Sequence, residues 1–276
     1  VRDLARLARD ASGQRMKLEG ADNPENLVRL FARNAQAAVR DMLDGVRGYR
    51  QIEASGPGLR DAIIMATGQQ GKLGFWNTEK VKEFSDYLVL RRAAALYEKF
   101  ERGDLANRPL AMSKADVLQG IADAEKANPN LSAGAQMVHD YTRNLLKKMY
   151  DGGLIEADLF EKLMKEDFYV PFYRDMRDKP ASGAPGGGSS PDGPGMTEVV
   201  KRMRGSDRDI IDPIQSLMTQ TFLVNRTLQH NDIIKSFVAL ARNAQAMGAK
   251  GTGRILEEIP AHQIMGKKFD LAEAVA

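Results

Sequence analysis

The run of residues that follows Asp212-Pro213 most constrains the fold, because it contains neither glycine nor proline before Gly248. Asp212 and Pro213 are typical of a capped helix start, and Gly248 is typical of a helix end. At about 1.5 Å per residue, a helix over 212–247 is longer than about 50 Å. Helices of this length usually span a bundle or pack against another subunit, so we expect one long C-terminal helix.

Apolar residues form a stripe along this predicted helix, with a spacing that drifts between about 3.5 and 3.6 residues. A stripe of this kind is buried either against neighbouring helices or against another subunit. We therefore predict a packing or oligomerisation surface whose candidate residues are Ile214, Leu217, Met218, Val224 and Leu228.

Helical periodicity also dominates the rest of the chain, and the alternation that is typical of strands is nearly absent. Ser113 and Asp116 have the spacing of a capping box, and Asn128-Pro129 ends the helix that they open. The fold class is predicted to be all-α, a multi-helix bundle. The expected helices cover 24–47, 59–67, 78–102, 113–127, 132–151 and 156–166, before the long helix over 212–247.

Glycine, serine and proline dominate the stretch from Pro180 to Gly195, which contains no apolar side chain larger than alanine. Such a composition cannot offset the entropy of packing and predicts a flexible insertion. We expect a helical domain over 1–178, a linker over 179–195 and a second helical segment over 196–276. The chain starts at Val1 and has no closing signal at its end, so we expect a piece of a larger polypeptide.

Composition excludes several classes of protein. The chain has 276 residues, 43% hydrophobic and 28% charged, as in ordinary globular proteins, and a net charge of only +3. It contains no cysteine, which excludes disulfides, thiolate zinc sites and a cysteine nucleophile. No apolar run approaches the roughly 20 residues of a membrane-spanning helix, so no intrinsic transmembrane helix is expected.

Short basic clusters have acidic residues nearby, which favours solvated helix faces over phosphate-binding strips. This interpretation applies to Arg91-Arg92, Lys147-Lys148 and Lys267-Lys268. A fourth cluster provides the candidate nucleic-acid contact, formed by Lys201, Arg202 and Arg204. Non-specific contact with DNA through this cluster remains an open alternative.

No constellation of residues indicates catalysis. His139, His230 and His262 lie far apart and have no second ligand at helical spacing, so structural or surface roles are expected. The loop from Gly68 to Leu73 lacks the spacing of a phosphate-binding loop, and there is no nucleophile elbow. The carboxylates between Glu156 and Asp167 alternate with lysines, as on a solvated face. We therefore expect that the protein is not an enzyme and that it binds no cofactor, no metal and no small-molecule substrate.

An aromatic run, KEDFYVPFYRD, stands at the end of the predicted helix over 156–166. Pro171 restricts the residue before it to extended geometry, so the four aromatic side chains flank a bend. Large aromatics are usually buried, which favours a structural anchor over a binding surface. The predicted anchor consists of Phe168, Tyr169, Pro171, Phe172, Tyr173 and Arg174.

The segment from Asp167 to Arg174, followed by a Gly/Ser-rich insertion, resembles a pattern in large polyvalent proteins of tailed phages and conjugative elements. Asp212-Pro213-Ile214, followed by the segment 225–231, is similar to the helix that follows this motif in those proteins. The resemblance covers roughly residues 80 to 247. It adds no catalytic residue to any position of this chain.

The resemblance implies an internal virion, or ejection, protein as found in short-tailed phages. Such a chain is stored in the capsid interior, leaves ahead of the genome and forms a conduit across the host cell envelope and periplasm. Its expected partners are copies of itself and other virion proteins. Two alternatives stay open: a non-catalytic helical accessory domain of a polyvalent enzyme, and a DNA-associated helical scaffold.

Overall fold

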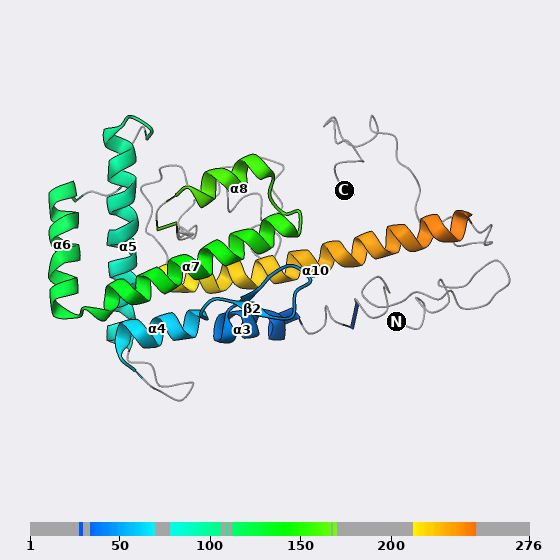
Figure 1. Ribbon diagram of the computed structural model, residues 1–276, viewed down its shortest axis with the longest axis horizontal. Helices are drawn as coiled ribbons and strands as arrows, with labels where there is room; N and C mark the ends of the chain where they lie inside the picture. The colour runs from blue at the N-terminus through cyan, green and yellow to red at the C-terminus, as the bar shows by residue number, and fades with distance from the viewer. Residues whose placement is uncertain are drawn as a thin grey trace, which may run out of the picture. The chain divides into compact units, whose positions relative to one another are not determined.

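In a computed structural model of the protein, the chain divides into two units, one of residues 36–225 and one of residues 1–35 with 226–276. Figure 1 shows its helices and strands. The structure describes residues 28–29, 34–69, 78–105, 109, 112–166, 168–169 and 212–246. The predicted insertion from Pro180 to Gly195 lies outside these residues.

The described residues are mainly helical, which confirms the coarse prediction of a mainly α fold. Within these ranges, the only strands are β1 (Val46–Arg47) and β2 (Ala54–Ser55). The helices are α3 (Asn34–Asp44), α4 (Leu59–Thr67), α5 (Thr78–Glu101), α6 (Lys114–Ala127), α7 (Asn130–Asp151), α8 (Ala157–Met164) and α10 (Pro213–Ala246).

Several helix ends follow directly from local sequence signals. The Ser113 hydroxyl accepts a hydrogen bond from the Asp116 backbone N–H at 3.1 Å, and the Asp116 carboxylate accepts one from the Ser113 N–H at 3.1 Å. The predicted capping box is thus confirmed at the start of α6. Gly68 ends α4 with a left-handed φ of 66°, and Asp212 caps α10 by accepting from the N–H groups of Ile214 and Gln215.

The prediction of a helix over 24–47 is wrong at the C-terminal end, because α3 ends at Asp44 and Val46–Arg47 forms β1. The stop is made by Gly45, whose φ of +106° is open to glycine alone. A Cβ at Gly45 would lie 2.2 Å from the backbone oxygen of Gly56. The reversal therefore requires glycine, and the strands after it depart from an all-α fold.

β1 and β2 form a small antiparallel hairpin in which Val46 pairs with Ser55. The hairpin rests on α7, where the Asn144 side chain donates to the Ser55 carbonyl at 2.6 Å. Arg50, in its loop, adopts a left-handed φ of 57°, and the Gln51 N–H donates to the Gly48 carbonyl at 3.0 Å. The loop is thus an ordered projection.

α4 and α7 form the centre of the core of the 36–225 unit. They approach closely at Gly134 of α7, where a Cβ would lie 2.6 Å from the Ala66 Cβ and 2.9 Å from the Ala62 carbonyl oxygen. The two helices can approach this closely because glycine has no Cβ at the point of contact. Fully buried side chains of these two helices include Leu59, Val138, Tyr141, Leu145, Leu146 and Met149.

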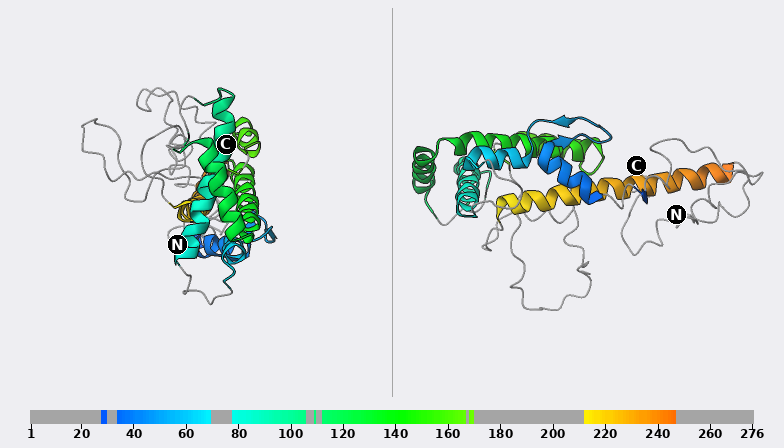
Figure 2. Two further views of the ribbon diagram at one scale, coloured as in Figure 1. Left: turned by 90° about the vertical axis from the view of Figure 1, so that its left-hand side faces the viewer. Right: turned by 90° about the horizontal axis from the view of Figure 1, so that it is seen from below.

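α3 and α4 lie between the hairpin and the first part of α10 (Figure 2). α5 and α6 pack against each other through a separate cluster formed by Ala93, Tyr97 and Val117. The first part of α10 belongs to the same compact unit as α3 to α8. The predicted division into a domain over 1–178, a linker over 179–195 and a segment over 196–276 stays a prediction. The predicted boundaries at 178 and 195 lie outside the described residues.

Candidate functional site

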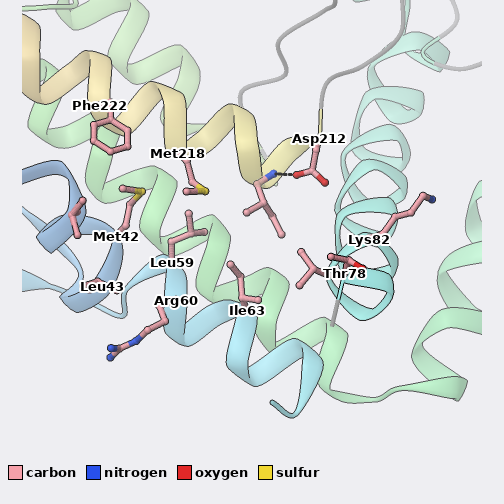
Figure 3. A pocket seen from close by; sticks show the side chains of 13 residues that line it. Met42, Leu43, Leu59, Arg60, Ile63, Thr78, Lys82, Asp212, Met218 and Phe222 are labelled. Carbon is pink, nitrogen blue, oxygen red and sulfur yellow. Dashed lines mark hydrogen bonds between the residues drawn. The ribbon is translucent and has the colours of Figure 1, made fainter. Parts of the chain in front are cut away.

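An apolar groove of about 540 Å³ opens between α3, α4, α5 and α10 (Figure 3). Its size lies within the range of about 300–1,000 Å³ that is usual for binding sites. Nine apolar side chains from the four helices line it: Val39, Met42, Leu43, Leu59, Ile63, Val81, Ile214, Met218 and Phe222.

Polar and charged groups lie at the edge of this groove. Figure 3 shows the Arg60 and Lys82 side chains pointing away from its centre, while the Asp212 carboxylate turns to the backbone of α10. Arg60 pairs with its neighbour Asp61 at 3.4 Å, and Lys82 pairs with Asp86 at 2.6 Å. The interior is thus suited to an apolar group rather than to a charged one.

The groove is open to solvent along one edge. Val39, Met218 and Phe222 there keep 40%, 41% and 37% of their surface exposed. Adjacent apolar side chains that stay exposed in a folded unit are typical of binding sites, whereas single exposed apolar residues are common everywhere. We therefore take this groove as the candidate functional site.

A buried polar network holds α3 and α10 in place around the groove. The Lys148 ammonium of α7 donates to the Asp41 carboxylate of α3 at 2.6 Å and to the Asn225 side-chain oxygen of α10 at 2.8 Å. The Asn225 amide donates back to Asp41 at 3.0 Å. All three residues are less than 10% exposed. Because each bond requires a defined position of its helix, the network fixes the register of the three helices.

Two further contacts extend the network. The Asp41 carboxylate also accepts from the Arg47 backbone N–H at 3.1 Å, which ties β1 to α3. The Tyr141 hydroxyl of α7 and the Thr221 hydroxyl of α10 are hydrogen-bonded at 3.0 Å. Burial raises the pKa of Tyr141 well above its ordinary value, so its phenol stays protonated. The wall that α10 contributes to the groove is thus anchored on α7.

A second charged cluster lies where the aromatic run begins. The Glu166 carboxylate accepts hydrogen bonds from the Arg92 guanidinium and from the Lys99 ammonium, the latter at 2.6 Å. The Tyr169 ring is 3% exposed and lies 5.5 Å from the Arg92 guanidinium. Burial raises the pKa of Tyr169 to about 12. The cluster links α5 to the segment after α8.

Phe168 occupies the neighbouring position on the same face. The Arg91 guanidinium lies 4.0 Å from the centre of its ring, and the His139 ring lies 5.4 Å away. Phe168 has a left-handed φ of 47°, which is unusual for a bulky residue and indicates that its surroundings hold it there. Phe168 thus contacts both α5 and α7.

The structure describes only these two residues of the predicted anchor. Pro171, Phe172, Tyr173 and Arg174 lie outside the described residues, as does the candidate nucleic-acid contact of Lys201, Arg202 and Arg204. The anchoring role of the whole run and the contact with DNA therefore stay predictions.

The interpretation as solvated helix faces is wrong for one residue in each of two basic clusters. Arg92 is 2% exposed and Lys148 is 7% exposed, and each forms a buried ion pair. The same correction applies to Glu166, whose side chain is 12% exposed. The prediction relied on acidic residues that lie near these basic residues in sequence. The actual partners of Arg92 and Lys148 are Glu166 and Asp41, which come from distant parts of the chain. Arg92 is accordingly not available to a phosphate.

The predicted stripe on α10 divides into two kinds of residue. Ile214, Leu217, Val224 and Leu228 are at most 5% exposed, whereas Met218 is 41% exposed and lines the groove. The sequence did not predict the groove, since four separate elements form it. The sequence does contain one signal for the buried network. Lys148 lies on the apolar face of α7, between Leu145 and Met149, where a lysine needs a buried partner.

The charged cluster around Glu166 predicts that the stability of the fold depends on pH in the acidic range. Burial alone raises the pKa of Glu166, but the charge of Arg92 and the hydrogen bonds from Lys99 and Arg92 outweigh it, so the pKa lies below its ordinary value of 4.5. Because the folded pKa is lowered, the stabilisation is complete above about pH 4.5 and is lost as the pH falls through the folded value.

We therefore expect Glu166→Gln to be less stable than the unchanged protein at pH 7, with a difference that narrows towards about pH 3. Chemical denaturation across this range measures it. Glu161→Gln is the matched control, because the Glu161 side chain is 70% exposed. A difference between Glu166→Gln and the unchanged protein that does not vary with pH would contradict the expectation.

Two searches of the described residues give negative results. No helix among them is both long and apolar enough to cross a membrane. In the same ranges, no group of histidine, cysteine, aspartate or glutamate side chains is arranged to hold a metal ion.

Comparisons of the chain with models of protein families, with curated proteins and with solved structures found no match.

Proposed function

We propose that this chain is a structural, non-catalytic module of an internal virion protein of a tailed phage. It is stored in the capsid interior, is ejected ahead of the genome and assembles with copies of itself and with other ejection proteins. The assembly forms part of a conduit across the host cell envelope and periplasm. Support comes from the resemblance of Asp167–Arg174 and of the segment from Asp212 onwards to large polyvalent proteins.

The observation that carries the assembly role is the open apolar groove. Met218, which the sequence assigned to a packing or oligomerisation stripe, lies at the exposed edge of this groove with Phe222. An exposed apolar edge on a folded unit is stabilised when a partner covers it. A protein that functions by assembly requires such a surface, and a rigid one suits it best.

In this proposal the module is a multi-helix bundle whose long C-terminal helix is α10. The Gly/Ser/Pro-rich stretch from Pro180 to Gly195 is a flexible insertion that precedes this helix. The buried network of Lys148, Asp41 and Asn225 keeps α10 in a fixed register, so that its exposed side chains always form the same surface.

Mass spectrometry of purified particles tests the proposal. The full-length gene product is expected in mature particles of the phage that encodes it, and it is expected to be depleted from particles that have released their genome. A replication protein from the same phage serves as the control for contamination by host lysate. Absence of the product from mature particles would reject a virion role.

A further inference from the structure

We propose that the first part of α10, over residues 213–225, is a detachable element of the 36–225 unit. It separates from α3 and α7 as one piece, while the contact between α4 and α7 stays intact. In the docked state the buried network holds it in a single register. The open state is reached without complete unfolding and does not depend on the proposed virion role.

The buried face of this part of α10 is half polar. Its large buried apolar side chains are Ile214, Leu217 and Val224. The polar side chains buried on the same part are Ser216, Gln220, Thr221 and Asn225. A polar side chain that becomes buried exchanges hydrogen bonds with water for hydrogen bonds within the protein. Its burial therefore stabilises the docked helix less than burial of a leucine does.

One of these polar groups lacks a full set of partners. The Gln220 side chain is 2% exposed, and its amide nitrogen lies 3.9 Å from the Met149 sulfur, which is a weak acceptor. The Gln220 side-chain oxygen accepts no hydrogen bond from the residues that the structure describes. A buried polar atom of this kind lowers the stability of the docked state, because water can satisfy it once the helix is released.

The charged part of the buried network does not hold α10. The ion pair between Lys148 and Asp41, at 2.6 Å, joins α7 to α3. α10 contributes only the neutral Asn225, which bonds both of these residues. Release of α10 therefore leaves the ion pair in place and separates no charge from its partner, which would be far more costly.

The contact between α4 and α7 is of a different kind. Gly134 lets the two helices approach so closely that a Cβ there would lie 2.6 Å from the Ala66 Cβ. Val138, one turn further along α7, is 0% exposed. Closely packed apolar contacts of this type open at a free energy near that of complete unfolding. We therefore expect this contact to persist when α10 leaves.

The opposite face of α10 is not covered. It borders the apolar groove, where Met218 and Phe222 keep 41% and 37% of their surface exposed (Figure 3). Residues 170–211 connect α10 to the preceding described segment, which ends at Tyr169, so the helix can move away without pulling on that segment. Segments with few buried apolar contacts are those that open locally in native proteins.

The opening also controls the candidate functional site. Ile214, Met218 and Phe222 form the wall that α10 contributes to the groove, so the groove is complete only while α10 is docked. A partner that requires the complete groove binds the docked state alone and shifts the equilibrium towards it.

Labelling of single introduced cysteines tests the opening, because the chain contains no cysteine of its own. Val224→Cys on α10 and Val138→Cys on α7 form a matched pair, since both valines are 0% exposed. Cysteine is itself a small apolar residue, so both variants are expected to fold, which circular dichroism verifies. A thiol reagent is added in buffer and at urea concentrations below the unfolding transition. The rate in high urea gives the unprotected rate at each position.

Relative to the unprotected rate, the thiol of Val224→Cys is expected to react at least about tenfold faster than the thiol of Val138→Cys. Its rate is also expected to rise less steeply with urea, because the opening of α10 exposes less surface than complete unfolding does. A urea denaturation curve for each variant corrects for any difference in overall stability.

Three outcomes overturn the opening. They are equal protection at the two positions, stronger protection in Val224→Cys, and an equally steep dependence on urea in both variants. Each would mean that α10 leaves only when the whole unit unfolds. The results are separable from the mass spectrometry of particles. A failure of the opening leaves the virion role in place, and absence of the protein from particles leaves the opening in place.

Discussion

Lys148→Met is expected to lower the free energy of unfolding by about 3–5 kcal/mol, because it removes the nearer of the two cations that pair with the buried Asp41 carboxylate and leaves only Arg47, at 3.6 Å. Asp41 is 1% exposed and its ion pair with Lys148 measures 2.6 Å. Methionine has a length similar to that of lysine, so the loss reflects the charge rather than an empty space. Urea denaturation at neutral pH measures the change.

Two further variants separate the charge from other effects. Lys147→Met changes the neighbouring lysine, which is exposed, and is expected to alter stability by no more than about 0.5 kcal/mol. Asp41→Leu combined with Lys148→Met removes both charges and is expected to be more stable than Lys148→Met alone, since no unpaired charge remains. A Lys148→Met variant as stable as the unchanged protein would show that the pair does not stabilise the fold.

Leu217→Ala is expected to lower the free energy of unfolding by about 2–5 kcal/mol, as is typical when a fully buried leucine is truncated. Leu217 lies on α10 and has 0% of its surface exposed. The prediction tests whether the first part of α10 belongs to the core of the 36–225 unit. Thermal and urea denaturation, followed by circular dichroism, measure the loss.

The adjacent residue provides the control for this experiment. Met218→Ala is expected to change the stability of the monomer far less, because Met218 is 41% exposed and truncating it removes few contacts within the chain. If Leu217→Ala and Met218→Ala lower stability equally, the assignment of Leu217 to the core and of Met218 to the groove is wrong.

Local sequence signals predicted the helices well. Ser113 and Asp116 defined the start of α6, and Gly68 defined the end of α4, because each acts through its own backbone and its nearest neighbours. The hairpin escaped prediction for a related reason. Its strands contain two residues each, which is too short for an alternation of polar and apolar residues to be recognised.

Long-range pairing was beyond prediction from one sequence. Arg92 and Lys148 each follow another basic residue, and such pairs usually lie on solvated faces. Each is buried together with a partner that is distant in the sequence. Arg92 is hydrogen-bonded to Glu166, and Lys148 is hydrogen-bonded to Asp41. The groove is a stronger example, since its walls come from four helices and no stretch of sequence contains it. The functional hypothesis came from the resemblance to large polyvalent proteins. The structure contributed the apolar groove, to which the proposal assigns the assembly role.

The network around Lys148 also has a consequence for the order in which the chain folds during synthesis. Asp41 and Lys148 are separated by 107 residues, and Asn225 lies 184 residues after Asp41. The ribosome therefore completes α3 and α7 well before the residue that joins them to α10 has been made. Contacts of such long range slow folding, because a large loop must close before they form. We expect the nascent chain to remain incompletely packed until α10 emerges, and a chain truncated before residue 212 to aggregate.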